Sequence, residues 1–251
     1  NGADDIAVSN IVGSNIFNVL VVLGISAAIL PLRVHSRLIR RDVPILLAVS
    51  MAVWGMASTG RVTWQAGLAL LTALVINTVW ELRTAKEEGE AEAGGEIDQD
   101  DAKGGFLPAF IKLAAGLGLL VWGSQILVKG ATAIALSLGV SETLIGLTIV
   151  AAGTSMPELV TSIVAALRGK ADLAIGNVIG SNLLNQLVIL GLCAFLSGDR
   201  GISVDPMIIQ RDLPIMVATT VACLPIFFSG GVITRLEGGI LIGLYGLYLV
   251  E

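Results

Sequence analysis

The residues best suited to chemistry in this chain surround Glu158, the one Asp or Glu that lies deep inside an apolar stretch. An ionised carboxylate at the middle of a bilayer costs several kcal/mol, so such a residue usually has a function and a partner. The segment ending there reads Ala151-Ala-Gly-Thr-Ser-Met-Pro-Glu158. A carboxylate that only holds helices together through Ser or Thr is the alternative interpretation.

Pro157 lacks an N–H, so the carbonyl of Gly153 loses its helical partner. A free carbonyl in hydrocarbon needs a cavity or an ion to face. Thr154 and Ser155 precede Glu158 by four and three residues, which places their hydroxyls on its side of a helix. Carboxylate, hydroxyl and carbonyl oxygens are the ligands of hard cations such as Ca²⁺ and Na⁺. An ordinary proline kink is the competing explanation.

A second polar pattern occurs twice in the chain. Residues 177–191 read NVIGSNLLNQLVILG, and residues 10–24 read NIVGSNIFNVLVVLG. Each copy aligns three side chains along one helix face, namely Asn177, Ser181 and Asn185, and Asn10, Ser14 and Asn18. These oxygens would complete a cation's shell around the Glu158 segment, whereas hydrogen bonding between helices is the alternative. Cation binding and hydrogen bonding between helices are equally good interpretations for Asn10, Asn15, Asn177 and Asn182. Cation binding is favoured for the innermost Asn18 and Asn185. Gly176 and Gly180 suit close helix packing.

The composition indicates the elements that hold these residues. Of the 251 residues, 55% are hydrophobic and only 14% charged, with a mean hydropathy of +0.86. This excludes soluble, disordered and nucleic-acid-binding classes, because a soluble domain carries about 25% charged residues. The chain has no phosphate loop, CxxC motif or nucleophile triad, so we expect neither an enzyme nor an ATP-driven pump. Eight stretches are long enough to cross a bilayer, near 6–30, 43–59, 63–83, 106–139, 143–167, 173–197, 213–229 and 234–250.

The segment 84–105 separates the third stretch from the fourth. Residues 81–103 hold nine acidic and three basic side chains, and 84–105 has no aromatic residue or helical apolar stripe. We therefore expect a solvated, mobile linker. Eleven Lys and Arg residues fall on the linker's side of the predicted spans and three on the other. By the positive-inside rule the linker is cytoplasmic, and Asn1 and Glu251 are external.

The repeated motif also predicts the topology. Its copies begin in the first and sixth stretches, five helices apart, so they cross the membrane in opposite directions. That is the mark of an inverted-repeat transporter with its site at the repeat interface near the midplane. We assign residues 1–83, with three helices, to the first repeat and 106–251, with five, to the second. Symmetry predicts two further helices before residue 1.

Residues 153–158, GTSMPE, and 176–185, GNVIGSNLLN, resemble the second α-repeat of sodium/calcium exchangers, within the calcium:cation antiporter superfamily. Residues 10–18 resemble the closing half of the first α-repeat. The resemblance covers essentially the whole chain and is nearest the prokaryotic branch. It implies an all-α polytopic membrane protein with two inverted five-helix halves, of which this chain matches helices three to ten.

The resemblance also implies roles for individual residues. Glu158 would bind Ca²⁺ and Na⁺. The hydroxyls of Thr154, Ser155, Ser181 and Ser14 and the carbonyl of Ala151 would serve flanking Na⁺ sites, and Asn185 and Asn18 would line the centre. The family's first-repeat G-T/S-S-x-P-E segment is absent here, so the chain alone lacks a second glutamate. Position 185 is Asn where potassium-dependent relatives have Asp, which disfavours potassium dependence.

The function predicted is Na⁺/Ca²⁺ antiport by alternating access, without a cofactor, in a prokaryotic inner membrane. Membrane lipids are the expected surroundings, and the oligomeric state stays open, a monomer included. A proton/Ca²⁺ antiporter of the same fold, with Glu158 carrying the proton, is the nearest rival. A cation channel and a non-transporting membrane scaffold are rivals from other classes.

Overall fold

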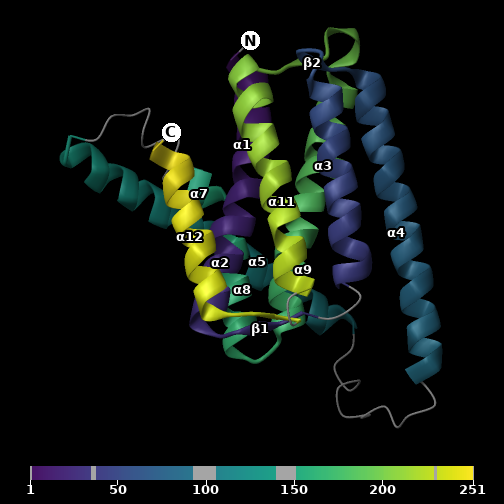
Figure 1. The fold of residues 1–251 in the computed structure, drawn as a ribbon, viewed down its shortest axis with the longest axis vertical. Coiled ribbons are helices and arrows are strands. Elements are labelled where there is room, and N and C mark those ends of the chain that lie inside the picture. Colours follow the sequence, from purple (N-terminus) through teal and green to yellow (C-terminus); the bar gives the residue numbers. More distant parts are fainter. Residues whose placement is uncertain (1, 35–37, 93–105, 140–150, 229–230, 251) are drawn as a thin grey trace.

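The computed structural model describes residues 2–34, 38–92, 106–139, 151–228 and 231–250, and nearly all of them are helical. Figure 1 shows a bundle in which most of the long helices run in roughly the same direction, whereas the teal helix over Phe106–Ser137 lies obliquely to them. The first of these begins with α1 (Gly2–Phe17), passes through the π-helical η1 (Asn18–Val22) and ends with α2 (Leu23–Ile29). Next come the π-helical η2 (Leu38–Asp42), α3 (Val43–Ala57) and α4 (Trp64–Glu92).

The second half of the chain begins with helices that have no counterpart in the first half, and then repeats the order of the first half. After α5 (Phe106–Ser137) come the short α7 (Ala151–Thr154) and α8 (Met156–Leu167). A long helix then runs through α9 (Ala171–Leu184), the π-helical η5 (Asn185–Leu190) and α10 (Gly191–Leu196). A 3₁₀ turn, η6 (Gly198–Arg200), precedes the π-helical η7 (Ile208–Asp212), α11 (Leu213–Phe228) and α12 (Arg235–Val250).

Helices occupy every stretch that the hydropathy pattern assigned to a span. Four of them are long and apolar enough to cross a membrane alone, over Ala7–Ile29, Trp64–Thr84, Phe110–Ser137 and Ala171–Leu196. The other stretches hold shorter helices, and the start of the fifth, 143–150, lies outside the described residues. These helices fit the expectation of an all-α polytopic membrane protein.

The predicted linker begins later than the sequence suggested. We placed its start at residue 84, but α4 continues through Glu92. Residues 84–92 are rich in Ala, Glu and Lys, which are good helix formers, and extending an existing helix avoids the cost of nucleating one. Hydropathy therefore located the end of the apolar stretch rather than the end of the helix. The remainder of the linker, 93–105, lies outside the described residues.

The motif-bearing helix of the first repeat is the centre of the bundle. In the apolar stretch of this helix, 83% of the residues are buried. The corresponding share is 50% for the equivalent helix α9–α10 and 11% for α4. Ile16, Leu20 and Leu23 are almost completely buried there, as are Ile175 and Leu187 on the other helix. The two copies of the motif are thus placed side by side in the interior.

Two short strand pairs join the repeats at opposite ends of the bundle. β1 (Leu32–Arg33) pairs antiparallel with β4 (Val232–Ile233), and β2 (Arg61–Val62) pairs antiparallel with β3 (Ile202–Ser203). In Figure 1, β1 lies near the bottom and β2 near the top. Each pair takes one strand from each half, and β1 follows the first motif copy as β3 follows the second. The arrangement is that of an inverted repeat.

Glycine pairs bring helices of opposite repeats into backbone contact. A Cβ on Gly238 of α12 would lie 2.6 Å from the carbonyl oxygen of Gly24 on α2. A Cβ on Gly67 of α4 would lie 2.7 Å from the carbonyl oxygen of Gly191 on α10. Only glycine allows such an approach. The last helix of each half therefore packs against the motif-bearing helix of the other.

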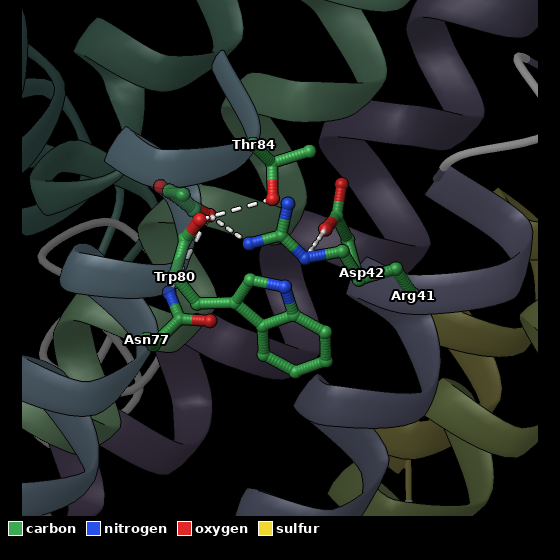
Figure 2. Close-up of polar contacts among 6 residues, drawn as sticks. Arg41, Asp42, Asn77, Trp80 and Thr84 are labelled. Carbon is green, nitrogen blue, oxygen red and sulfur yellow. Dashed lines mark hydrogen bonds and ion pairs between the residues drawn. The ribbon is translucent and has the colours of Figure 1, made fainter. Parts of the chain in front are cut away.

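Arg41 of η2 and Arg211 of η7 each stack on the last helix of their own half. Figure 2 shows Arg41 with its guanidinium over the Trp80 ring of α4, 4.9 Å from the ring centroid. It also lies 3.8 Å from a carboxylate oxygen of Glu81 and 3.8 Å from one of Asp42. In the second half, Arg211 donates to the Tyr248 carbonyl at 2.7 Å and covers the Tyr248 ring. The two halves thus repeat their internal packing.

Candidate functional site

The helix carrying Glu158 is broken where Pro157 predicted a break. α7 ends at Thr154, and α8 begins at Met156 with Pro157 in its first turn. Ser155 between them is buried and non-helical, with φ −99° and ψ 9°. The chain is continuous here but the helical hydrogen-bond ladder is interrupted, as a proline requires.

The carbonyl freed by Pro157 has a protein partner that the sequence did not reveal. Ser124 of α5 donates its hydroxyl to the Gly153 carbonyl oxygen. Gly153 also packs directly against Val128, one helical turn further along α5, so no side chain would fit at position 153. We expected this carbonyl to face a cavity or an ion, and the structure adds a hydroxyl of the protein as a donor to it. Sequence spacing could not connect positions 124 and 153.

Glu158 lies in the first turn of α8 and is partly buried. Its Oε2 is buried and has no hydrogen-bond partner in the described part of the chain. Asn177 of α9 donates to the main-chain carbonyl of Glu158 at 3.1 Å and to the Ser162 hydroxyl at 3.0 Å. Asn177 therefore ties α9 to α8, leaving the carboxylate itself available to a ligand.

Hydroxyl and amide oxygens of the first repeat meet the broken helix. The Thr154 hydroxyl donates to Asn10 Oδ1 at 3.4 Å, and its oxygen lies 3.5 Å from the Ser14 hydroxyl oxygen. Ser14 is buried, whereas Thr154 is exposed. The structure thus brings together residues 140 and 144 positions apart, from the two halves of the chain.

Both π-helical segments in the motif-bearing helices start at predicted site residues, η1 at Asn18 and η5 at Asn185. Single π-turns inside α-helices are frequently found at functional sites. The Asn18 amide nitrogen donates to Asn182 Oδ1 at 3.0 Å, and the Asn185 amide nitrogen donates to Asn15 Oδ1 at 2.9 Å. The Asn18 Oδ1 is buried with no partner among the described residues.

The remaining predicted residues lie on the same elements. Ala151 begins α7, and Ser181 is partly buried on α9, one turn before Asn185. Among the described residues, no group of three or more His, Cys, Asp and Glu side chains is arranged to hold a metal ion. A cation in this region would therefore rely on Glu158 together with neutral oxygens.

The two glycines of the second motif copy do not pack closely against a helix. An added Cβ at Gly176 or Gly180 would meet no described atom within 4 Å, and the same holds at Gly13 of the first copy. The expectation of close packing at Gly176 and Gly180 is wrong for the described structure. Close approach occurs instead at the Gly24–Gly238 and Gly67–Gly191 pairs, whose partners on other helices the sequence did not show.

Comparison with protein families decides the class of this molecule. The model described as "Sodium/calcium exchanger protein" matches residues 1–83 and 108–250, nearly the entire chain. The chain belongs to the sodium/calcium exchanger protein family. The resemblance drawn from the two motif copies is thereby confirmed, and the chain is an integral membrane protein of a transporter family.

Individual relatives of this exchanger-family chain are similar along most of their length. The chain is 32% identical to the inner membrane protein YrbG of Escherichia coli, over 97% of the chain and 77% of that protein. It is 36% identical to the putative antiporter CaxA of Alkalimonas amylolytica, over 96% of the chain and 76% of that protein. The sodium/calcium exchanger MaX1 of Methanosarcina acetivorans is 28% identical, over 99% and 80%.

A solved structure has the same fold. The sodium-calcium exchanger NCX_Mj, soaked with Na⁺ and Sr²⁺, superposes with a TM-score of 0.77 and 27% sequence identity. The match covers 100% of this chain and 78% of that one. The inverted-repeat, exchanger-like fold expected from the sequence is therefore confirmed.

Proposed function

We propose that this protein exchanges Na⁺ for Ca²⁺ across a membrane by alternating access, with the ions bound between the two repeats. The observation that carries the proposal is a pair of buried oxygens without hydrogen-bond partners among the described residues, Glu158 Oε2 and Asn18 Oδ1. They belong to different halves of the chain. A buried polar atom is normally paired, and an unpaired acceptor is free to bind a cation.

The surrounding oxygens suit hard cations. Glu158 supplies the charge, and Asn18 and Asn185 supply neutral amide oxygens at the centre. The hydroxyls of Thr154 and Ser14, which approach each other across the repeats, would serve a flanking Na⁺ site, with Ser155, Ser181 and the Ala151 carbonyl. Because Ca²⁺ and Na⁺ would share ligands, occupation by one would oppose binding of the other. No covalent step and no cofactor is needed.

The membrane setting follows from the same proposal. The relative YrbG is an inner membrane protein, and we assign this chain to the same kind of membrane, surrounded by lipid. By the positive-inside rule, the excess of Lys and Arg favours a cytoplasmic β1–β4 end. The β2–β3 end, where α1 begins and α12 ends, would face outward (Figure 1).

Proton coupling is the rival that this geometry also permits, because the unpaired Glu158 oxygen would accept a proton as well as a cation. Proteoliposomes holding the full-length protein separate the two. We expect ⁴⁵Ca²⁺ uptake to follow an outward Na⁺ gradient at equal pH on both sides. Uptake that follows a pH gradient in the absence of Na⁺ would replace the proposal with proton/Ca²⁺ exchange.

A further inference from the structure

Four asparagines form a hydrogen-bonded network between the two motif-bearing helices. Asn15 and Asn18 come from α1 and η1, and Asn182 and Asn185 come from α9 and η5. Asn15, Asn18 and Asn182 are at most 1% exposed. Every bond in the network crosses from one repeat to the other.

The network has the two-fold pattern of the repeats. Asn182 Nδ2 donates to the Asn15 main-chain carbonyl at 3.1 Å, and Asn15 Nδ2 donates to the Asn182 main-chain carbonyl at 3.4 Å. Likewise, Asn18 Nδ2 donates to Asn182 Oδ1, and Asn185 Nδ2 donates to Asn15 Oδ1. Asn15 corresponds to Asn182 in the repeated motif, and Asn18 to Asn185. The two sets of bonds are thus equivalent.

The main-chain carbonyls decide which way every amide group faces. A carbonyl only accepts, so the end of Asn182 that faces Asn15 must be its NH₂ group. Its Oδ1 then faces Asn18, which must present its own NH₂ group. The same reasoning fixes Asn15 and, through it, Asn185. Asn18 and Asn185 thus turn their NH₂ groups toward the opposite repeat, and the buried Asn18 Oδ1 has no partner among the described residues.

We propose that Asn15 and Asn182 are positioning residues for the ion site, each holding the amide oxygen of the opposite repeat's Asn185 or Asn18 ready for a cation. This inference rests on the proposed function. The NH₂ group of Asn182 donates to a main-chain carbonyl, and its Oδ1 accepts from Asn18. Asn15 makes the two equivalent hydrogen bonds. They therefore act through the neighbouring amides instead of binding the ion themselves.

Removing a positioning residue would free the amide that it holds. In Asn182→Leu, which keeps the side chain's shape, the Asn18 amide loses its acceptor and is free to turn its NH₂ group toward the cation. Groups that orient metal ligands typically contribute 10- to 100-fold to affinity. We expect Asn182→Leu to weaken Ca²⁺ binding about 10-fold or more, and Asn15→Leu to do the same through Asn185.

The test is Ca²⁺ binding to the purified full-length protein, measured as the rise in unfolding temperature with free Ca²⁺. Ser26→Ala is the matched control, because Ser26 is fully buried on α2 and donates only to Val22 of its own helix. Ser26→Ala should keep the wild-type Ca²⁺ dissociation constant even if its ion-free unfolding temperature falls. Asn182→Leu should bind Ca²⁺ more weakly at whatever ion-free stability it has.

Double mutants distinguish positioning from general packing. Asn18→Ala and Asn182→Leu should be strongly non-additive in Ca²⁺ affinity, because either change removes the same interaction. Asn185→Ala with Asn182→Leu, on one helix, should be closer to additive. Wild-type affinity in folded Asn182→Leu, or no difference between the two cycles, would overturn the inference. A wild-type protein that binds no Ca²⁺ would instead overturn the proposed function.

Discussion

Glu158 and Asn18 each bury a side-chain oxygen that has no hydrogen-bond partner among the described residues. Both sit where a helix departs from α geometry, Glu158 just after the break at Ser155 and Asn18 at the start of a π-turn. Burial of a polar atom without a partner costs free energy, so these two oxygens lower the stability of the ion-free fold. A bound cation would remove that cost.

Ser124 supports the break at Gly153, and its loss should affect transport. Ser124→Ala would leave the Gly153 carbonyl without a donor, at a cost of about 1–3 kcal/mol. We expect Ca²⁺ uptake per folded protein to fall, because the segment leading to Glu158 would shift. Ser137→Ala on the same helix removes only a bond to Ile134 and should leave uptake unchanged. Equal uptake by the two variants would show that Ser124 has no such role.

Much of the site at this scale was predictable. The lone carboxylate, the proline break and the repeated Asn and Ser positions are all local patterns. The partners of these residues were not, because Ser124 and Gly153 or Asn15 and Asn185 meet only through the packing of separate helices. Sequence reasoning also treated the asparagines as ligands or as bonds between helices. In the structure the amide nitrogen of Asn18 makes such a bond while its oxygen stays unpaired.

At the scale of elements, the hydropathy pattern predicted where the helices lie more accurately than where they end. Hydropathy found each apolar stretch, but it placed the end of α4 at 83, whereas helical propensity carries it through Glu92. The π-turns η1 and η5 were not predicted, because one extra residue per turn leaves almost no trace in an apolar sequence. The glycines that bring helices into contact were also indistinguishable from the other glycines.

Gly238 and Gly239 provide a direct test of helix packing, since they are neighbours on α12. A methyl group on Gly238 would meet the Gly24 carbonyl, whereas one on Gly239 would meet no described atom within 4 Å. We expect Gly238→Ala to destabilise the fold by about 1–3 kcal/mol through overpacking. Gly239→Ala should be neutral or slightly stabilising. Unfolding of the detergent-solubilised variants measures this, and equal stabilities would contradict the packing described.

In the described residues, the two motif-bearing parts of the chain are joined at three levels. Strand pairs link them at both ends, glycine contacts link their helices, and four asparagines link their centres. The two copies of the sequence motif predicted this symmetry. They could not show that the last helix of each half packs against the motif-bearing helix of the other.

Sidedness is a prediction for the whole molecule. Lys170, in the turn between α8 and α9, and Asp199, in the turn after α10, are both exposed and lie at opposite ends of the α9–α10 helix. With Cys193 and Cys223 replaced by Ala, we expect Asp199→Cys to react with a membrane-impermeant thiol reagent on intact cells. Lys170→Cys should react only after the membrane is opened. The reverse pattern would invert the proposed orientation.

The central claim is that Na⁺ and Ca²⁺ compete for one site containing Glu158. The most direct test is Na⁺-gradient-driven ⁴⁵Ca²⁺ uptake into proteoliposomes by the full-length protein, beside Glu158→Gln, with Glu237→Gln as control. Glu237 is partly buried and caps the start of α12 by accepting from the Thr234 main-chain N–H at 2.7 Å. The account predicts Na⁺-dependent uptake in the wild type and in Glu237→Gln, and none in folded Glu158→Gln. Wild-type uptake by Glu158→Gln would contradict it.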